Sequence, residues 1–317
     1  MLSGDMVAVV TPMDADGTVN YRQFAKVIDF HVESGTQALV VAGTTGESAT
    51  LDHEEHIDVI AKACELAAGR IPIVAGTGSN STAQTLKLSR AVDRLPVVAF
   101  LVVTPYYNKP TQEGMRRHFS AIADAVSRPL ILYNVPGRTG VDLKPETVIK
   151  LASHPNIQAI KEATGELNRI RVLRDACGPG FKLLSGDDAT CCEFMLQGGD
   201  GVISVTANVA ASAMRQLCDA AISRQRAAAE AIDARLQPLH RTLFCESNPI
   251  PVKWAMQRMG RKMKDPVRGG LVLPGTRLEQ AAHDGDPSGM ANALGRLERV
   301  GETKHLMATR DQNSYQL

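Results

Sequence analysis

Two kinds of segment alternate along this chain. Short runs of Val, Ile, Leu and Ala are typical of strands buried on both faces, and longer stretches between them carry apolar residues at helical spacing. Three helices are predicted at 21–33, 53–66 and 81–92, each after a residue that commonly caps a helix: Asn20, Asp52 and Asn80. Eight strands are predicted, at 6–10, 38–42, 71–75, 97–103, 130–133, 157–161, 182–185 and 201–204.

Eight strand–helix units within residues 1–223 favour the α/β class and a closed (β/α)8 TIM barrel. An open doubly wound sheet usually has fewer strands and a glycine-rich dinucleotide turn after the first, whereas the first turn here is Thr11-Pro12-Met13-Asp14. Residues 224–317 are predicted as a C-terminal helical region, with helices near 224–243 and 251–259. The pattern is less regular from Arg261 onward, and the polar stretch 309–317 is expected to be disordered.

Composition narrows the class of protein. The chain has 317 residues, 44% hydrophobic and 22% charged, which is the balance of a soluble globular protein. It contains no apolar run of the roughly 20 residues that span a bilayer, and its N-terminus lacks the features of a signal peptide, so we expect a cytoplasmic protein without membrane contacts. The net charge of +1, with acids and bases interspersed, argues against nucleic-acid binding. Its expected partners are small molecules and copies of itself.

The six cysteines do not form a metal-binding pattern. None belongs to a C-x-x-C pair or to a Cys/His cluster with zinc-ligand spacing, so no metal site is predicted. We expect buried free thiols. The adjacent Cys191 and Cys192 fit small core residues of a helix better than a redox pair.

Lys161 closes the apolar run 157–160, which places an amine at the C-terminal end of a buried strand. Burial disfavours the ammonium form of a lysine, and an uncharged amine can attack a carbonyl to form a Schiff base. Polar residues also follow other strands: Thr44 and Thr45, Tyr106 and Tyr107, and Tyr133. Loops that follow the strands of a barrel open on one face, so these groups are expected to converge there.

Each of these motifs also has an ordinary structural interpretation. The turn Gly43–Glu47 offers hydroxyls and backbone N–H groups to a small carboxylate, but it also fits a plain strand–helix turn. Tyr133 alone resembles a core residue, although a phenol beside an amine can shuttle protons. Arg138 alone resembles a surface charge, although its guanidinium can hold a carboxylate through two hydrogen bonds. Convergence with Lys161 favours the functional interpretation.

Several segments, taken in order, resemble the signature motifs of the dihydrodipicolinate synthase family, within the pyruvate-dependent class I aldolases. They are Gly43-Thr44-Thr45-Gly46-Glu47-Ser48, Thr104-Pro105-Tyr106-Tyr107-Asn108-Lys109-Pro110, Tyr133–Gly140, Ile160-Lys161-Glu162-Ala163-Thr164 and Asn248-Pro249-Ile250-Pro251-Val252-Lys253-Trp254. The resemblance extends from about Gly4 to Trp254. It implies a lyase that condenses pyruvate with L-aspartate 4-semialdehyde to 4-hydroxy-tetrahydrodipicolinate, on the route to diaminopimelate and lysine.

The resemblance also assigns catalytic roles. Lys161 would form the imine with pyruvate, Tyr133 would act as general acid and base, and Thr44 would link Tyr133 to Tyr107 in a proton relay. The tyrosine at the Tyr107 position enters the neighbouring subunit's site in this family. The implied assembly is therefore at least a dimer, and commonly a homotetramer built as a dimer of dimers.

Four further residues would bind substrate, again by resemblance. Thr45 would hold the pyruvate carboxylate and Arg138 that of the semialdehyde, while Gly186 and Ile203 would shape the pocket through their backbone. No metal or organic cofactor is implied, because the imine itself is the electron sink. N-acetylneuraminate lyases and keto-deoxy sugar-acid aldolases share the lysine and tyrosine, and the charged Arg138 loop favours the synthase over them. A non-catalytic homologue is the remaining alternative.

A second, regulatory site is implied by positions that bind the feedback inhibitor L-lysine in sensitive members of the family. The matching residues are Ser48, Ala49, His53, His56, Asn80, Gln84 and Tyr106. Gln84 stands where those members carry glutamate, so we expect partial or weak inhibition. The alternatives are a solvated helix face and, less favoured because no cysteine lies nearby, a zinc site.

Overall fold

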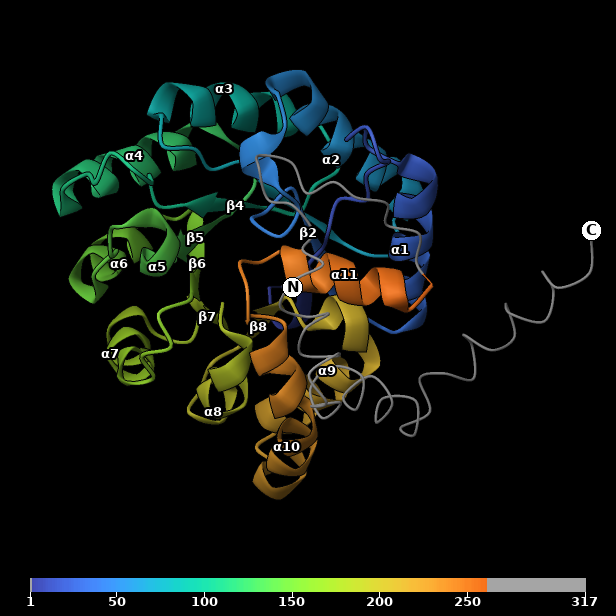
Figure 1. Cartoon of the computed structure of the whole chain (residues 1–317). Helices are drawn as coiled ribbons and strands as arrows, with labels where there is room; N and C mark the ends of the chain where they lie inside the picture. The colour runs from blue at the N-terminus through green and yellow to red at the C-terminus, as the bar shows by residue number, and fades with distance from the viewer. Residues whose placement is uncertain (1, 261–317) are drawn as a thin grey trace, which may run out of the picture.

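The computed structural model describes residues 2–260 and shows eight parallel strands closed into a barrel in chain order, with helices around it (Figure 1). This confirms the predicted TIM barrel. The strands are β1 (Gly4–Ala8), β2 (Ala38–Val41), β3 (Ile73–Gly76), β4 (Ala99–Val103), β5 (Leu130–Asn134), β6 (Ile157–Glu162), β7 (Lys182–Ser185) and β8 (Gly201–Ser204). Pairing of β1 with β8 closes the barrel.

The helices form an outer layer, and two segments contain short 3-10 turns. In order they are α1 (Tyr21–Glu33), η1 (Ser48–Thr50), α2 (His53–Ala67), α3 (Thr82–Val92), α4 (Gln112–Ala125), α5 (Pro136–Thr139), α6 (Pro145–Ala152), α7 (Asn168–Cys177), η2 (Asp188–Thr190), α8 (Cys191–Leu196), α9 (Ala207–Ile222), α10 (Arg226–Thr242) and α11 (Ile250–Arg258). Figure 1 shows α11 lying across one end of the barrel.

Strand alternation produces two apolar cores. On β5, Ile131 and Tyr133 face the barrel interior, while Leu130 and Leu132 pack outward against the helices. The interior cluster is small and joins residues such as Met6, Leu101 and Ile203. Because both faces are covered, the strands are apolar almost throughout, which is why the sequence shows continuous runs and not alternating ones.

All eight predicted strands are present, β7 and β8 with the predicted bounds and the others with boundaries that differ by at most two residues. The first begins at Gly4 and not at residue 6, because Gly4 pairs with Gly201 of β8, while the apolar Val9 and Val10 continue beyond the ladder. The caps Asn20 and Asp52 are confirmed by bonds from the backbone N–H groups of Gln23 (2.9 Å) and Glu55 (2.8 Å).

The third cap was predicted one residue too early. The cap of α3 is Ser81, whose side chain accepts from the backbone N–H of Gln84, whereas the Asn80 carbonyl accepts from the Asn108 side chain. The expected burial of the thiols is correct for Cys64, Cys191, Cys192 and Cys218. It is wrong for Cys245, which is exposed, and for Cys177, which is half-buried.

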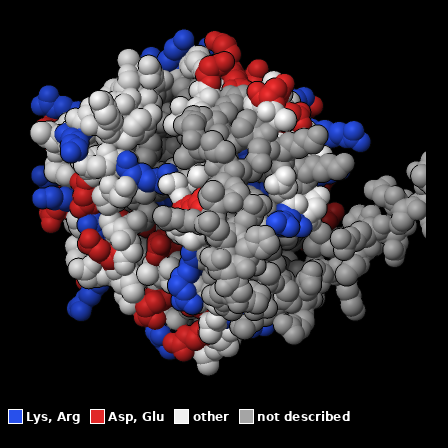
Figure 2. Space-filling model, viewed as in Figure 1, with Lys and Arg blue, Asp and Glu red and all other residues white. Residues whose placement is uncertain are grey.

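The helices predicted after the barrel correspond to α10 and α11. The predictions for the irregular region from Arg261 and for 309–317 lie outside the described residues. No helix within residues 2–260 is long and apolar enough to cross a membrane. Figure 2 shows acidic and basic side chains interspersed around the described rim of the face in view, in keeping with the near-neutral net charge.

Candidate active site

Lys161 and Tyr133 lie side by side at the C-terminal ends of two neighbouring strands. They are register partners on β6 and β5, and the Lys161 Nζ lies over the Tyr133 ring, 4.4 Å from its centroid. Both side chains face the barrel interior and are 4% and 6% exposed. Among residues 2–260 the Lys161 amine has no hydrogen-bond acceptor or ion-pair partner, so its nitrogen is not committed to a structural contact.

Gly186 leaves the space in which the lysine side chain lies. A Cβ atom at this position would stand 2.7 Å from the Ala163 Cβ and 3.0 Å from both Cγ and Cε of Lys161. The contact with Ala163 is closer than Cβ atoms approach in proteins and those with Lys161 are tight, so a larger residue here would force these side chains to shift. Ile203 lies in the same interior cluster as Tyr133 and is 1% exposed. Gly186 therefore lies beside the lysine, and Ile203 faces the same barrel interior as the tyrosine.

The loop after β2 places Thr44 and Thr45 at the same end of the barrel. It is held in an uncommon conformation, because Ala42 and Glu47 have φ values of 53° and 60°. The loop after β4 shares this property at Tyr107 (71°) and Lys109 (45°). Four of the six non-glycine residues with positive φ within residues 2–260 thus lie in these two loops. Such strain persists where surrounding contacts over-determine the backbone, and it gathers at functional sites.

Asn248 connects the two predicted carboxylate-binding residues, and the sequence did not assign it a role. Its side-chain amide donates to the Thr45 Oγ1 (2.9 Å), and its backbone carbonyl accepts from the Arg138 guanidinium (2.9 Å). Thr45 is buried whereas Arg138 is exposed in the short helix α5. The segment that precedes α11 therefore fixes the distance between the β2 and β5 loops.

A buried ion pair reinforces this link. The Lys253 ammonium on α11 lies 2.6 Å from a carboxylate oxygen of Glu47, and their side chains are 1% and 2% exposed. The only hint in the sequence is that Lys253 interrupts an apolar helix face, between Val252 and Ala255. Its partner lies 206 positions away and could not be identified from local pattern.

Tyr107 is 88% exposed at the rim, although it is a large aromatic residue. Its backbone N–H donates to the Thr139 carbonyl (3.2 Å), which ties it to the loop that carries Arg138. Within the described part of the single chain, the hydroxyls of Thr44, Tyr107 and Tyr133 make no hydrogen bonds to one another. The relay among them stays a prediction.

A cavity of about 540 Å³ opens between the loops after β2, β3, β4 and β5. Its lining includes Thr44 and Arg138 together with six of the seven residues predicted to bind lysine: Ser48, Ala49, His53, His56, Gln84 and Tyr106. Asn80 is not part of the lining. The cavity thus corresponds to the predicted lysine site and reaches the candidate catalytic site only at Thr44 and Arg138, since Lys161 and Tyr133 do not line it.

Two polar residues of this cavity are already engaged. His56 is buried, its Nε2 lies 2.7 Å from the Gly76 carbonyl, and burial lowers the pKa of its imidazole. A neutral His56 that donates to Gly76 is a structural residue, so the solvated-face alternative is wrong at this position. Gln84 is exposed and accepts at its side-chain oxygen from the Ser79 hydroxyl (3.1 Å).

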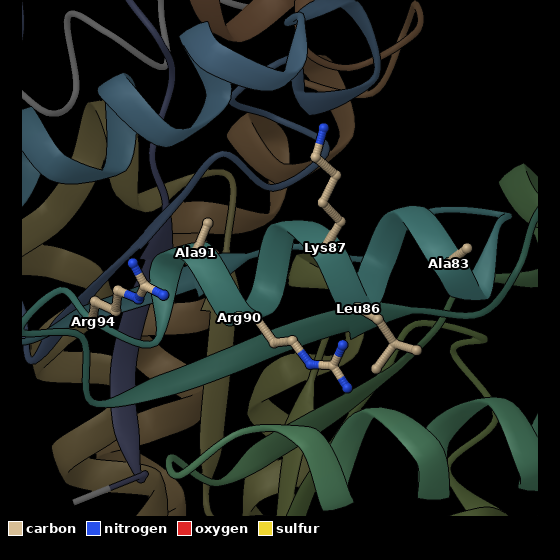
Figure 3. A pocket seen from close by; sticks show the side chains of 6 residues that line it. All are labelled: Ala83, Leu86, Lys87, Arg90, Ala91 and Arg94. Atoms are coloured by element: carbon tan, nitrogen blue, oxygen red, sulfur yellow. The ribbon is translucent and has the colours of Figure 1, made fainter.

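A second, shallower hollow of about 510 Å³ lies on the outer side of α3. Figure 3 shows its lining, which comprises Ala83, Leu86, Lys87, Arg90, Ala91 and Arg94. Only Lys87 also lines the larger cavity, and none of the predicted site residues is present. Within residues 2–260, no group of three or more His, Cys, Asp or Glu side chains is arranged to hold a metal ion.

Comparisons with known proteins identify the family. The family model described as the dihydrodipicolinate synthetase family matches residues 1–281. A 4-hydroxy-tetrahydrodipicolinate synthase from Thioalkalivibrio sulfidiphilus is 55% identical over 283 residues, covering 89% of this chain and 95% of that protein.

Two solved structures are also similar. The chloride-inhibited dihydrodipicolinate synthase from Acinetobacter baumannii, complexed with pyruvate, has a TM-score of 0.88 and 47% identity, covering 94% of this chain and 99% of that one. The enzyme from Cyanidioschyzon merolae, with lysine bound, has a TM-score of 0.87 and 36% identity, covering 92% and 98%.

Proposed function

The chain belongs to the dihydrodipicolinate synthetase family, and we propose that it condenses pyruvate with L-aspartate 4-semialdehyde to give 4-hydroxy-tetrahydrodipicolinate in diaminopimelate and lysine biosynthesis. The observation that carries this proposal is the buried Lys161 amine, 4.4 Å from the centroid of the Tyr133 ring at the open end of the barrel. The pyruvate complex of the Acinetobacter relative supports the same first substrate.

The residues divide the chemistry between them. Lys161 attacks the keto carbon of pyruvate and forms an imine with loss of water, and Tyr133 transfers the protons that this step requires. The imine then accepts the electron pair left when the pyruvate methyl group loses a proton, and the resulting enamine attacks the aldehyde carbon. Thr45 holds the pyruvate carboxylate and Arg138 the carboxylate of the semialdehyde. This mechanism calls for no metal or organic cofactor.

Borohydride reduction in the presence of pyruvate tests the proposal. The expected result is a stable adduct on Lys161 and on no other lysine, located by peptide mass mapping. An unchanged protein mass after reduction would contradict the imine. Cleavage of N-acetylneuraminate by the wild type, without condensation of the semialdehyde, would favour the sugar-acid aldolases instead.

We further propose that the active unit is a homotetramer built as a dimer of dimers. Support comes from Tyr107, whose 88% exposure and strained backbone suit a side chain that completes a neighbour's site. Light scattering after size exclusion should give four times the 34.0 kDa chain mass. Mixing Tyr107→Phe with Lys161→Ala should then restore activity above that of either variant alone, because each subunit can supply the group that the other lacks. A monomeric, fully active protein would contradict the assembly.

L-lysine is proposed as a weak inhibitor that binds in the cavity beside η1 and α2. The lysine-bound Cyanidioschyzon relative and the shared lining residues support this assignment. Calorimetry should show weak binding in the wild type and tighter binding, by about 1 kcal/mol, in Gln84→Glu, where a carboxylate meets the ligand ammonium. Absence of binding at millimolar lysine in both proteins would reject the site.

Two broader proposals complete the assignment. We place the protein in the cytoplasm, as expected of a biosynthetic enzyme whose substrates are central metabolites. We divide the chain after residue 223, between the end of α9 at Ile222 and the start of α10 at Arg226. Limited proteolysis that first cleaves in this linker would support the division.

A further inference from the structure

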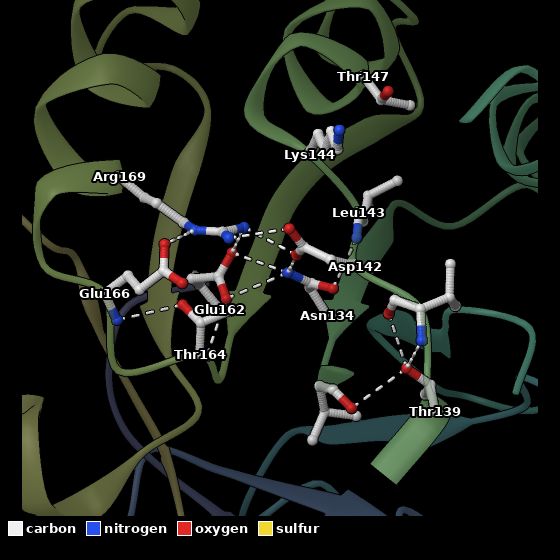
Figure 4. Close-up of polar contacts among 12 residues, drawn as sticks. Asn134, Thr139, Asp142, Leu143, Lys144, Thr147, Glu162, Thr164, Glu166 and Arg169 are labelled. Atoms are coloured by element: carbon white, nitrogen blue, oxygen red, sulfur yellow. Dashed lines mark hydrogen bonds and ion pairs between the residues drawn. The ribbon is translucent and has the colours of Figure 1, made fainter. Parts of the chain in front are cut away.

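A polar network joins residues at the ends of β5 and β6 to α7 and to the loop after β5 (Figure 4). Asn134 and Glu162 each follow a catalytic residue in the chain and are register partners, just as Tyr133 and Lys161 are. Successive side chains of a strand point to opposite faces. The register pair Tyr133 and Lys161 therefore points into the barrel, and the next pair, Asn134 and Glu162, points outward.

The two outward side chains hold each other and their loops. The Asn134 amide nitrogen lies 3.3 and 3.2 Å from the two Glu162 oxygens and donates to Asp142 at 2.8 Å. The Glu162 carboxylate also accepts from the backbone N–H of Thr164 at 2.9 Å. The side-chain oxygen Oδ1 of Asn134 accepts from the backbone N–H of Leu143 at 2.9 Å. The ends of the loops that follow β5 and β6 are thereby tied to the strands.

Arg169 of α7 completes the network as the cation that pairs with its carboxylates. It donates to both oxygens of Asp142 at 2.9 Å, lies 3.6 Å from Glu162, and donates to Glu166 at 2.8 Å. The residue is 9% exposed, although arginine is rarely buried without partners. Burial raises the pKa of Glu162, while Asn134 and Arg169 act against this shift. Without the arginine, the carboxylates of Asp142, Glu162 and Glu166 would lose their shared cation.

The network also contacts the loop that carries Arg138, the candidate ligand of the semialdehyde carboxylate. Arg138 lies in α5, and the chain returns to the network at Asp142 and Leu143. Two parallel hydrogen bonds join the planar guanidinium of Arg169 to the planar carboxylate of Asp142. They fix the relative orientation of the two groups as well as the distance between them. The geometry of Tyr133, Lys161 and the Arg138 loop therefore has a common anchor.

We propose that Arg169 is a positioning residue, which acts through Asn134, Asp142 and Glu162 to hold the Lys161–Tyr133 pair and the Arg138 loop in register for imine formation. This inference rests on the proposed function. Arg169 does not touch the substrate; it fixes the strands and loop that carry the groups that do. Misplacing a reacting group by about 1 Å costs roughly 100-fold in rate, so loss of the anchor should appear in the chemical step.

The same helix supplies a matched control. Arg174, one turn and a half further along α7, is a half-buried arginine paired with Asp200, and it donates to the carbonyls of Gly178, Phe181 and Gly198 at the other end of the barrel. Arg169→Met and Arg174→Met remove the same charge and the same number of atoms from one helix. Both variants should lower the melting temperature.

Only Arg169→Met should slow the reaction. Single-turnover trapping of the pyruvate imine and kcat for condensation should each fall by roughly 10- to 100-fold, with KM for pyruvate changed less than about threefold. Arg174→Met should keep wild-type trapping and kcat. Arg169→Lys keeps the charge without the fork and should recover only part of the trapping rate.

Three outcomes would overturn or separate the proposals. Equal kcat and trapping rates in Arg169→Met and wild type, at temperatures where both are folded, would reject the positioning role. If Arg169→Met does not fold, Asp142→Asn, which weakens the same fork, must slow trapping relative to Arg174→Met or the inference fails. Failure of the wild type to form any borohydride adduct would reject the proposed function itself.

Discussion

The two ends of the barrel use charged residues in different ways. At the N-terminal end, the Arg174 guanidinium donates to three loop carbonyls and to Asp200, and Lys182 donates to the same aspartate at 3.0 Å. At the C-terminal end, the Lys161 amine lies over an aromatic ring without a hydrogen-bond partner among residues 2–260, and the Arg138 guanidinium donates to a backbone carbonyl at 2.9 Å. Arg174 and Lys182 at one end form contacts that stabilise the fold, whereas Lys161 and Arg138 at the other end keep donors available for a ligand.

This contrast predicts which substitutions should lower stability and which should lower activity. Arg174, Lys182 and Asp200 at the N-terminal end form hydrogen bonds within the chain, so their removal should cost free energy of unfolding. The candidate reacting groups have few protein partners, so their removal should cost rate. The network around Arg169 and the Glu47–Lys253 pair lie between these extremes, because they stabilise the same loops that carry the chemistry.

The largest expected effect compares two lysines. Lys161→Ala should lower turnover by about 10⁴-fold or more and abolish borohydride trapping, because the imine has no other amine to form on. Lys182 lies at the N-terminal end of β7, away from the catalytic site, where it forms a partly exposed ion pair with Asp200. Lys182→Ala should therefore change kcat less than twofold. Steady-state kinetics and thermal melts of both variants provide the measurement. Comparable losses of activity in the two would erase the contrast between the ends.

The next effect concerns stability at the rim. Lys253→Met leaves the buried Glu47 carboxylate without its ammonium and should cost about 3 to 5 kcal/mol of unfolding free energy. Lys62→Met is the control, because its ion pair with Glu65 is exposed and contributes about 0 to 1 kcal/mol. Urea titrations would measure both. A loss below about 1 kcal/mol in Lys253→Met would show that this pair is not a structural tie.

Arg138→Ala should have a moderate effect that is confined to the second substrate. Loss of a charge-assisted contact of roughly 1.5 to 3 kcal/mol should lower kcat/KM for the semialdehyde about 10- to 150-fold. Pyruvate trapping on Lys161 should proceed at the wild-type rate. A parallel loss of trapping would place Arg138 in the first step instead.

The smallest effect is a pH dependence of stability that arises from Asp5, near the start of β1. Asp5 is fully buried, and both of its carboxylate oxygens lack hydrogen-bond partners among the described residues. Burial, together with Asp188, raises the pKa of Asp5 from 3.8 to about 8. The folded chain therefore keeps a proton that the unfolded chain has released, and stability falls as pH rises between these values.

Between pH 7 and 9 the loss attributable to Asp5 should be about 1 kcal/mol, and Asp5→Asn should lack it. The difference between urea titrations of the two proteins at these pH values isolates this group. Identical pH dependence in both would mean that Asp5 is already ionised in the folded chain at pH 7.

Local pattern was sufficient for the barrel and for the candidate pair at its open end. Lys161 and Tyr133 stood out because a polar residue that ends an apolar run is conspicuous, and barrel topology then brings the strand ends together. Six of the seven residues predicted to bind lysine line the larger cavity, whereas of the predicted catalytic and substrate-binding residues only Thr44 and Arg138 do.

The supporting residues could not be predicted because their signals are weak or distant. Arg169 reads as an ordinary helix charge until its partners across α7, β5 and β6 are known. Asn248 and Lys253 contact residues about 200 positions earlier, and no local period encodes such a pairing. The strained backbone at Glu47 is likewise invisible in a residue type that has no preference for positive φ.

The tie between Glu47 and Lys253 has a consequence for how the enzyme matures. During synthesis the first 47 residues emerge long before α11, so the Thr44–Glu47 loop cannot acquire its final contacts until almost the whole described chain has left the ribosome. Early barrel intermediates would hold Lys161 and Tyr133 without the finished carboxylate-binding loop. Competence for catalysis is therefore acquired at the end of folding, when the last described helix docks across the barrel mouth.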